Sequence, residues 1–587
     1  MTRGPFREVT LPPPPVPEWT LPTEPDPEAV GLLARELSLP PSLCGLLVAR
    51  RVMDPESAKQ FLRPRLDDLH PPGDLKDLDR AVSRIGQAVS RGETVLVHGD
   101  YDVDGVCAAA LLTLWIRRLG GSAVPFVPHR VKDGYDLGPA GLRAAERTGA
   151  SLLVTCDSGI LAHGAVEEAI SMGLDVIVTD HHAPGARLPP AVAVVNPNRH
   201  DCDYPFSDLS GTGVVFKLCQ GLARAAGIPA KELWPHLDLV ALATIADLVP
   251  LRGENRTLTR FGLRYLARTT KPGLRALLRE SKLEGHAEID AGRVGFVLAP
   301  RINAAGRVDD ADVALRLLLT EDAQEAGRLA RHLEEANTRR KEEDRATLDD
   351  ALARLAGVFD PGRDFGVVLA GEGWHPGVIG IVASRLVERI HRPVVLVTFE
   401  GDTGRGSARS IPGVHVLDAI RAGADHLTRF GGHRQAAGLD LEMVQLPAFR
   451  EAFNTHVRKQ LGGKVPRPRV SGDLTLPLAA ANDDLHRLLR YLGPFGIGNP
   501  RPVFCARGLE LVGRPREVGS GHLKLRLADG GHQLEAIGFG LARRVPPERL
   551  GHRIDALFQL RENEYRGVRA LQARVIDVRP SEADGDL

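Results

Sequence analysis

His98-Gly99-Asp100-Tyr101-Asp102-Val103-Asp104-Gly105 directly follows the short apolar stretch TVLV, and this junction decides the fold class. Similar apolar stretches recur as AVPFVP, LLVTCD, DVIVTD and AVAVVNP, with helix-like segments between most of them. Continuous apolar strands that alternate with helices predict a parallel sheet covered on both faces. Such sheets place their chemistry at the carboxyl ends of the strands. We therefore expect an α/β domain over residues 91–260 with a site at that edge.

Further acidic and histidine residues follow later strands and helices of this region. They are Asp157 in VTCDSG, Asp180, His181 and His182 in VTDHH, and Asp247 in ATIADLVPL. A single Asp at a strand–helix junction is equally well explained as a helix cap. Capping does not explain the histidines or three closely spaced Asp residues, whereas divalent cations neutralise such crowding. Oxygen-rich sites with one or two imidazoles suit Mn²⁺ or Mg²⁺, so the set predicts metal-dependent phosphoester hydrolysis.

The composition limits the class of protein. The 587 residues predict about three or four domains, and 43% hydrophobic content excludes wholesale disorder. With 75 Lys+Arg against 75 Asp+Glu, the whole chain is not a polybasic nucleic-acid binder. The six cysteines contain no CxxC pair, which favours a reduced, intracellular protein without zinc knuckles. The chain shows no secretory signal and no apolar stretch of membrane-spanning length, so we expect a cytoplasmic protein.

The rest of the chain divides by pattern and composition. We expect the following segments: a Pro-rich arm over residues 1–27, a helical N-terminal segment over 28–90, the α/β domain over 91–260, a helical linker over 261–357, a second α/β domain over 358–448, and a small β-barrel over 465–580. Residues 450–580 hold 23 Lys+Arg against 13 Asp+Glu. The neutral chain therefore contains one basic module.

Nine motifs in order resemble a known family. HGDYDVDG, VTCDSG, VTDHH and the Asp of ATIADLVPL resemble the four motifs of the DHH phosphoesterase superfamily. PRINAAGR, GWHPGVIGIVASRL, GSARS, FGGHRQAAG and PFGIGNPRPVF further resemble the RecJ family of single-strand-specific 5′→3′ DNA exonucleases. The resemblance runs from about residue 75 to the end. It implies an α/β fold with a DHH parallel-sheet domain, a second, DHH-associated α/β domain joined to it by a long helix, and an OB-fold-like barrel.

The resemblance also implies a centre with two Mn²⁺ or Mg²⁺ ions. One ion would be held by His98, Asp102 and Asp157, and the other by Asp104, Asp157, His181 and Asp247, so that Asp157 bridges the two. Asp100 would either bind a metal directly or contact a ligand, and both options stay open. His182 would face the scissile phosphate instead of a metal.

Three further groups of residues would contact the substrate. By resemblance, the 5′-phosphate pocket would consist of Arg130, Ser407 and Arg409, phosphates near the metals would be bound by Arg301, Asn303 and Arg307, and the strand backbone would approach Gly431, Gly432 and His433. Simpler explanations are a surface loop for the pocket residues, a brace for the linker helix at Asn303, and a core histidine at His433. Ala408 stands where the family often has Gly, a change that should leave Ser407 and Arg409 usable.

The implied activity is release of 5′-mononucleotides from single-stranded DNA in recombination and repair. Implied partners are the DNA strand, a single-strand-binding protein and a helicase, with a monomeric chain. One alternative is a DHH enzyme that cleaves oligoribonucleotides or small nucleotides, although such substrates need no strand-binding barrel. Another is a non-catalytic replication scaffold, which would not need every metal-ligand position filled.

Overall fold

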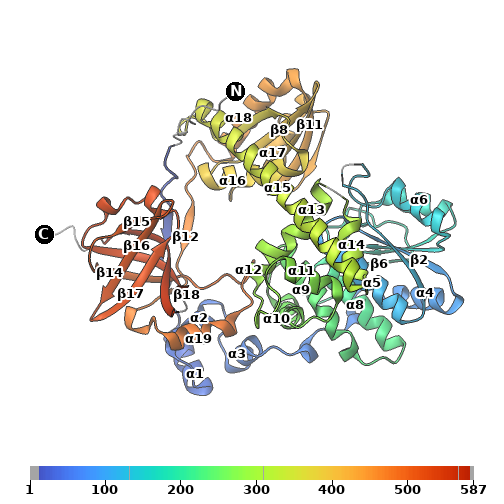
Figure 1. The fold of residues 1–587 in the computed structure, drawn as a ribbon, viewed down its shortest axis with the longest axis horizontal. Helices are drawn as coiled ribbons and strands as arrows, with labels where there is room; N and C mark the ends of the chain where they lie inside the picture. Colours follow the sequence, from blue (N-terminus) through green and yellow to red (C-terminus); the bar gives the residue numbers. More distant parts are fainter. Residues whose placement is uncertain (1–11, 131, 309, 566–567, 582–587) are drawn as a thin grey trace. The chain divides into compact units, whose positions relative to one another are not determined.

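The computed structural model describes residues 12–130, 132–308, 310–565 and 568–581. Figure 1 labels the helices and strands of the chain, which divides into two compact units. The first unit consists of Lys59–Arg339 and Arg490–Arg501. The second holds the described residues of Met1–Ala58, Arg340–Leu489 and Pro502–Leu587. The six segments expected from the sequence do not correspond to these two units, so their boundaries stay predictions.

The first unit contains a five-stranded parallel sheet in the order β3-β2-β4-β5-β6. Its strands are β2 (Thr94–Gly99), β3 (Ser122–Phe126), β4 (Leu152–Cys156), β5 (Asp175–Thr179) and β6 (Ala193–Val195). The register pairs Gly99 with Cys156 and Cys156 with Thr179. The next residues along the chain are Asp100, Asp157 and Asp180. The expected parallel sheet is confirmed, and its register brings three acidic residues to one edge.

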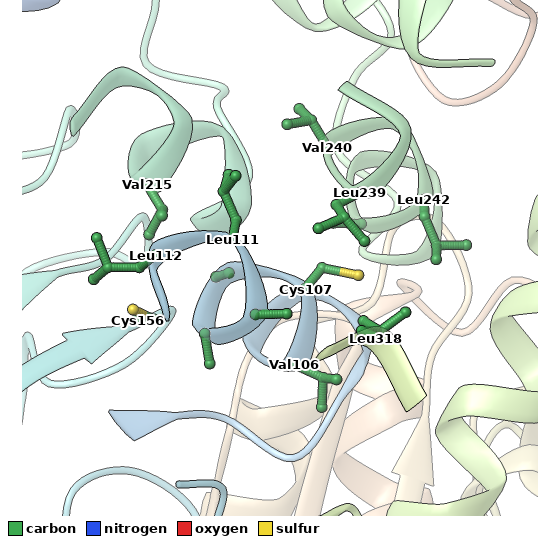
Figure 2. Close-up of a cluster of buried hydrophobic side chains, with 14 of the residues drawn as sticks. Val106, Cys107, Leu111, Leu112, Cys156, Val215, Leu239, Val240, Leu242 and Leu318 are labelled. Atoms are coloured by element: carbon green, nitrogen blue, oxygen red, sulfur yellow. The ribbon is translucent and has the colours of Figure 1, made fainter. Parts of the chain in front are cut away.

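Helices cover both faces of this sheet. Helices α4 (Leu78–Arg91), α5 (Val103–Arg118) and α8 (Gly211–Ala225) contribute to one buried cluster, and α6 (Pro139–Thr148) and α7 (His163–Ser171) to another. Helix α5 is apolar on nearly all sides, which is typical of a helix enclosed by other elements. Figure 2 shows side chains of α5 between those of α8 and those of α9 (Leu237–Ala246). This packing fixes the N-terminus of α5, where the acidic motif lies.

The described residues of 253–358 form mainly helices, as expected for the linker. The elements are α10 (Gly253–Ala267), α11 (Pro272–Glu280), α12 (Ala291–Arg293), the π-helical turn η5 (Val294–Leu298), α13 (Ala299–Val308), α14 (Asp312–Leu319) and α15 (Ala323–Val358). Helix α15 has 36 residues, and both units contain part of it. The expectation of a long helix in the linker is confirmed.

The second unit contains a mixed five-stranded sheet in the order β10-β11-β9-β8-β7. The strands are β7 (Val367–Glu372), β8 (Val394–Glu400), β9 (Thr403–Arg409), β10 (Arg429–Gly432) and β11 (Ala436–Glu442). Only β7 and β8 pair in parallel. Helices α16 (Pro376–Ile390), α17 (Val416–Arg421) and α18 (Leu446–Gln460) contribute buried side chains to its two apolar clusters.

The same unit contains a β-barrel. Strands β14 (Phe504–Leu511), β18 (Arg553–Tyr565), β19 (Val568–Pro580), β17 (His532–Gly538) and β16 (His522–Asp529) follow one another, and β14 also pairs with β16. That last pairing closes the sheet on itself, so the predicted barrel is confirmed. The short strands β13 (Leu474–Thr475) and β15 (Arg516–Val518) join β14 and β16, respectively.

The N-terminal segment contacts the barrel. Residues 1–11 of the predicted arm lie outside the described residues, but β1 (Glu18–Thr20) pairs in parallel with β12 (Arg469–Ser471). The indole N–H of Trp19 donates to Asp577 of β19 at 2.7 Å. Helices α1 (Pro27–Leu37), α2 (Pro41–Ala49), α3 (Pro55–Leu62) and α19 (Asp483–Leu489) complete the fold. Among the helices of the described residues, none is long and apolar enough to span a bilayer.

Candidate metal and phosphate site

The acidic and histidine side chains of the first unit converge at the carboxyl edge of its parallel sheet. His181 Nε2 lies 3.1 Å from Asp157 Oδ1, 3.5 Å from Asp247 Oδ2 and 4.0 Å from Asp104 Oδ2. Three overlapping groups have the spacing of metal ligands: Asp157, His181 and His182; Asp104, His181 and Asp247; and Asp100, Asp102 and Asp157. Residues from separate stretches of the sequence thus form one cluster.

Backbone geometry holds Asp157 and Asp104 in this cluster. Asp157 follows β4 with φ +64°, a left-handed conformation that is uncommon outside glycine. A Cβ atom at Gly211 would lie 2.5 Å from Asp157 Oδ1, so only glycine fits there. The N–H groups of Gly211 and Thr212, at the start of α8, each donate to a different oxygen of Asp104 at 2.7 Å. Each oxygen keeps a second lone pair that a cation can use.

Asp102 caps helix α5. Its Oδ1 accepts from the N–H groups of Asp104 at 2.9 Å and Gly105 at 3.1 Å. The N–H of Val103, the first residue of α5, donates to Asn303 Oδ1 at 3.2 Å. Asn303 therefore holds the turn that carries the acidic motif. Its described contact is with the protein backbone, and contact with substrate stays a prediction.

Two asparagines that the sequence did not single out fix the histidine loop. Asn198 Nδ2 donates to the carbonyl of His181 at 2.6 Å, and Asn196 Nδ2 donates to that of His182 at 2.9 Å. Both lie in NPN, directly after β6. Asp180 Oδ1 in turn accepts from the N–H groups of both histidines and lies 2.8 Å from His182 Nδ1. The position of NPN after a strand of the parallel sheet was the available signal.

The pKa values in the cluster show that its ionised carboxylates are unfavourable when no cation is bound. Burial, and next the charge of Asp104, raise the pKa of Asp157 well above its usual value. Burial, followed by the charges of Asp104 and Asp102, raises the pKa of Asp247 to about 8. Burial lowers the pKa of His98 to about 4. Cations would stabilise the ionised carboxylates and the neutral imidazole together.

The hydrogen bonding of the cluster fits cations. Among the described residues, no partner hydrogen-bonds to Asp100 Oδ1, Asp157 Oδ1, His181 Nε2 or either ring nitrogen of His98, although all these atoms are buried. His181 Nε2 and Asp157 Oδ1 lie close together without forming a hydrogen bond. Buried polar atoms are rarely left unpaired in proteins. Lone pairs that converge without donors between them are what a divalent cation requires.

His98 and Asp100 occupy places that differ in detail from the expected ligand set. His98 is fully buried at the end of β2, packed against Gly141 and the ring of Phe126, and belongs to none of the three metal-spaced groups among the described residues. Asp100 lies with Asp102 and Asp157 in one group. The geometry thus favours direct metal binding for Asp100, while the role of His98 stays a prediction.

The expected phosphate-binding arginines of the first unit lie in different surroundings. Arg130 was expected in the 5′-phosphate pocket, and Arg301 and Arg307 were expected near the metals. Arg130 is exposed, and its guanidinium carbon lies 5.0 Å from the centre of the Tyr101 ring. Arg301 forms an ion pair with Glu334 of α15 and donates to the carbonyl of Val297. Arg301 therefore braces the long helix, an explanation offered above for Asn303 of the same motif. Burial, and next the charge of Asp100, raise the pKa of Tyr101 in the acidic motif to about 12, and the charges of Arg130 and Arg307 act in the opposite direction.

Ser407 and Arg409 lie together on β9. Arg409 Nη1 donates to Ser407 Oγ at 3.1 Å and to the carbonyl of Ala408 at 2.8 Å. A Cβ atom at Gly380 of α16 would lie 2.7 Å from Arg409 Nη2 and 2.8 Å from Ser407 Oγ. The helix therefore approaches this pair only because residue 380 is glycine. Arg130 belongs to the other unit, so a pocket shared by the three residues stays a prediction.

Gly431, Gly432 and His433 lie at the edge of the second sheet. All three are exposed, which makes the core-histidine explanation for His433 wrong. Gly431 is the register partner of Gly438, and Gly438 is that of Ser407. The side chains of register partners on adjacent strands lie on the same face of a sheet. A row with little side-chain bulk thus leads from Gly431 to Ser407, and an extended backbone could lie on it.

The barrel carries a basic hollow of about 410 Å³. Its cationic side chains are Arg514, Arg516, Lys524 and Arg526, and Glu535 is its one acidic member among the described residues that line it. Glu535 pairs with Arg526 at 2.6 Å and with Lys524 at 3.7 Å. Arg514 and Arg516 have no such partner within the described barrel, so the hollow has a net positive charge.

The chain matches three domain families. Residues 94–244 match the DHH family, N-terminal domain; residues 364–459 match the DHHA1 domain; and residues 472–577 match the RecJ OB domain. The single-stranded-DNA-specific exonuclease RecJ of Escherichia coli strain K12 is 38% identical over 564 residues, which cover 92% of this chain and 96% of that protein.

Solved structures show the same relationship. The crystal structure of RecJ in complex with Mn²⁺ from Thermus thermophilus has a TM-score of 0.82 at 34% identity, covering 96% of this chain and 80% of that one. The structure of RecJ in complex with Mg²⁺ from the same organism has a TM-score of 0.77 at 31% identity, covering 96% of this chain and 78% of that one. The resemblance inferred from nine motifs therefore extends over nearly the whole chain.

Proposed function

The chain belongs to the RecJ family, and on that basis we propose that it is a single-stranded-DNA-specific exonuclease that releases 5′-mononucleotides in the 5′→3′ direction by metal-dependent hydrolysis, in DNA recombination and repair. The observation that carries the proposal is the buried cluster around His181, whose carboxylates and imidazoles converge without hydrogen-bond donors between them. Without cations, the buried charges of such a cluster destabilise the fold. Its carboxylates and imidazoles are suited to binding two cations.

The ligand sets follow from the distances. Asp104, His181 and Asp247 would hold one ion, and Asp100, Asp102 and Asp157 the other, with His98 as a further ligand by family resemblance. Asp157 approaches His181 and is grouped with Asp102, so it would bridge the ions. Two Mn²⁺ or Mg²⁺ ions would supply an activated water and a clamp on the attacking and leaving oxygens of a phosphodiester.

His182 would contact the scissile phosphate. Burial alone would lower the pKa of His182, but the hydrogen bond and charge of Asp180 outweigh it and raise that pKa to about 9. A protonated imidazole can donate from Nε2 to a phosphate oxygen, while Asp180 holds Nδ1. Asp180 fixes the orientation of the ring and thereby the direction of that donation.

The phosphate and strand contacts extend this site. Arg130, Ser407 and Arg409 would bind the 5′-phosphate, and Arg301, Asn303 and Arg307 phosphates near the metals. Gly431, Gly432 and His433 would contact the strand backbone, which fits their exposure. The basic hollow of the barrel would bind the strand further from the cut. The six cysteines are free, which supports a reduced, cytoplasmic location. A monomeric chain assisted by a single-strand-binding protein and a helicase remains part of the proposal.

The two alternatives account for fewer of these features. A small-nucleotide or oligoribonucleotide phosphodiesterase would use the metal cluster but not the basic barrel. A replication scaffold would use the barrel but would not need the ligand positions filled, and Asp100, Asp102, Asp104, Asp157, His181 and Asp247 are all present in the cluster.

One experiment distinguishes the three functions. Single strands labelled at the 5′ or the 3′ end would be incubated with the purified chain and Mn²⁺, beside matching RNA strands and DNA duplexes. We expect a labelled mononucleotide at once from the 5′-labelled strand and a ladder of shortening products from the 3′-labelled strand. Preferred cleavage of RNA would support the phosphodiesterase alternative, and no cleavage by metal-loaded protein would support the scaffold.

A further inference from the structure

The first unit contains a cavity that none of the proposed metal ligands lines. Its volume is about 540 Å³, in the range of small-ligand sites. It is bounded by α10, by residues 287–291 and by the stretch 490–501, which contains the FGIGNP motif. The sequence marked this motif as distinctive, and the proposed chemistry gives it no role.

The stretch 490–501 is fixed firmly to α10 and to the loop before it. Arg256 Nη2 donates to the carbonyls of Tyr491 at 3.0 Å and Gly493 at 2.9 Å, and Arg260 Nη1 donates to that of Tyr491 at 3.2 Å. The N–H of Leu251 donates to the carbonyl of Ile497 at 2.7 Å. The wall of the cavity that carries its aromatic rings is therefore held in place before any ligand arrives.

The cavity is cationic. Arg260, Arg264, Arg490 and Arg501 line it, against Glu288 and Asp290. Asp290 pairs with Arg501 at 3.1 Å, whereas no described carboxylate pairs with Arg264 or Arg490. A hydrogen bond from Arg490, and next the charges of Arg490, Arg63 and Arg260, lower the pKa of the Tyr491 phenol. That lowering agrees with a positive potential, which would repel metal cations and attract anions.

The cavity also offers aromatic surfaces. Tyr491 and Phe495 are both half-buried and both line it. The guanidinium carbon of Arg490 lies 5.2 Å from the Tyr491 ring centre, and that of Arg501 lies 4.7 Å from the Phe495 ring centre. Aromatic rings beside guanidinium groups are the means by which proteins bind a planar base together with its phosphate. An inorganic anion alone would leave these rings unused.

We propose that this cavity binds one nucleotide unit of a single strand, with the phosphate at Arg264 and Arg490 and the base against Tyr491 or Phe495. The inference rests on the proposed function, since it adds a point of attachment for the same strand outside the metal centre. A free nucleoside monophosphate, which is the product of the proposed reaction, has the same chemistry. The strand is favoured because the cavity is open at the surface, where Arg264 and Arg490 are exposed.

The test compares strand binding by the full chain and by the double variant R264Q/R490Q. Binding of 3′-fluorescein-labelled oligo(dT) would be followed by anisotropy in Ca²⁺ at several salt concentrations, using the inactive D157N background throughout. We expect the variant to bind a 30-nucleotide strand about tenfold or more weakly, and its log–log salt slope to fall by about 0.7 for each phosphate that the variant no longer binds. The control R275Q/R279Q removes two exposed arginines of α11 that pair with Glu284, and it should bind as the parent does.

Two further measurements test whether the cavity binds a strand. With Asp157 restored, R264Q/R490Q should retain its kcat on a 5-nucleotide strand, because no proposed metal ligand lines the cavity. Strands that carry 5-iodouracil should crosslink to Tyr491 or Phe495, and Tyr491→Leu with Phe495→Leu should abolish that crosslink. Unchanged strand affinity in R264Q/R490Q, together with abolished binding of dTMP, would overturn the proposal in favour of a free-nucleotide site. Nuclease activity of the unsubstituted chain is measured separately. Failure of the proposed exonuclease activity can therefore be distinguished from failure of the proposed nucleotide site.

Discussion

Asp180 binds His182, and it does not join the metal-spaced groups around His181. Its Oδ1 lies 2.8 Å from His182 Nδ1 and also accepts the N–H groups of both histidines. The acidic residue of the DHH motif therefore orients an imidazole, while the next residue, His181, turns its Nε2 toward Asp157 and Asp247. One short loop thus serves two purposes, because consecutive side chains point in different directions from a strand end.

Asp180→Asn should lower kcat with a smaller effect on Mn²⁺ affinity. The amide keeps the size of the side chain but loses the charge that raises the pKa of His182 to about 9. A raised pKa keeps the imidazole protonated below that value, so the alkaline limb of the kcat–pH profile should move to lower pH in the variant. Rates between about pH 6 and pH 10 measure this. An alkaline limb at the same pH in both proteins would contradict the assigned role of Asp180.

Asp157→Asn should abolish Mn²⁺ binding and hydrolysis while the metal-free protein becomes more stable. Burial and neighbouring carboxylates raise the pKa of Asp157, which means that its ionised form destabilises the metal-free fold. An amide removes this cost, as it removes the ligand. Thermal unfolding with EDTA and with Mn²⁺ tests both effects, and calorimetry measures the binding. Retention of nuclease activity by the folded variant would contradict the two-metal site.

Gly380→Ala should weaken the preference for a 5′-phosphate without loss of thermal stability. Alanine is favoured over glycine in a helix by about 1 kcal/mol. Its Cβ, however, would displace Ser407 Oγ and Arg409 Nη2, which lie within 2.8 Å of that position. Cleavage rates on 5′-phosphorylated and 5′-hydroxyl strands give the preference. Gly357→Ala in α15 is a matched control, since no atom lies within 4 Å of its added Cβ, and an unchanged preference in Gly380→Ala would place the pocket elsewhere.

Most of the fold and the central cluster could be predicted from the sequence. The parallel sheet follows from continuous apolar strands, and the cluster follows because Gly99, Cys156 and Thr179 are register partners. Strand ends that lie level place the next residues side by side. The positions of the motifs at the strand ends therefore predicted which side chains lie close together, as well as which residue types form the site.

The supporting contacts could not be predicted in the same way. Asn196 and Asn198 act on backbone carbonyls, and such contacts leave no pattern in the spacing of side chains. The pairing of Glu18 with Arg469 joins residues far apart in the chain, for which local periodicity gives no signal. The bracing role of Arg301 depends on the position of Glu334 in α15. Each of these depends on tertiary packing.

Arg514→Gln with Arg516→Gln should reduce the salt dependence of strand binding. These residues line the basic hollow of the barrel, and removing two phosphate contacts should flatten the log–log slope by about 1.4 on single strands. Substitution is preferable to deletion of the barrel, because β1 pairs with β12 and Trp19 binds Asp577. The control R549Q/R553Q carries the same charge change at exposed positions outside the hollow. Equal slopes in the two double variants would show that the hollow does not bind the strand.

His236 should make the first unit sensitive to acid. Burial, and next the charges of Lys271 and Arg118, lower the pKa of His236 to about 3, and its ring packs edge-on against Trp115. The unfolded chain takes up this proton near pH 6.5, whereas the folded chain does so only near the lowered value. Stability is therefore complete above about pH 6.5 and is lost as the pH falls toward 3. At about pH 5 the loss from this residue should be about 2 kcal/mol, since each pKa unit corresponds to about 1.4 kcal/mol.

His236→Gln removes the titrating group, so its unfolding free energy should fall less between about pH 7 and pH 5 than that of the parent chain. Because the chain has two compact units, hydrogen exchange of amides in α9 and α5 is a better measure than a single global transition. Loss of packing against Trp115 lowers stability equally at both pH values and cancels in the difference. His286→Gln, at an exposed position of the same unit, is the control. The same pH dependence in the parent chain and in His236→Gln would show that His236 is not the source of the acid sensitivity.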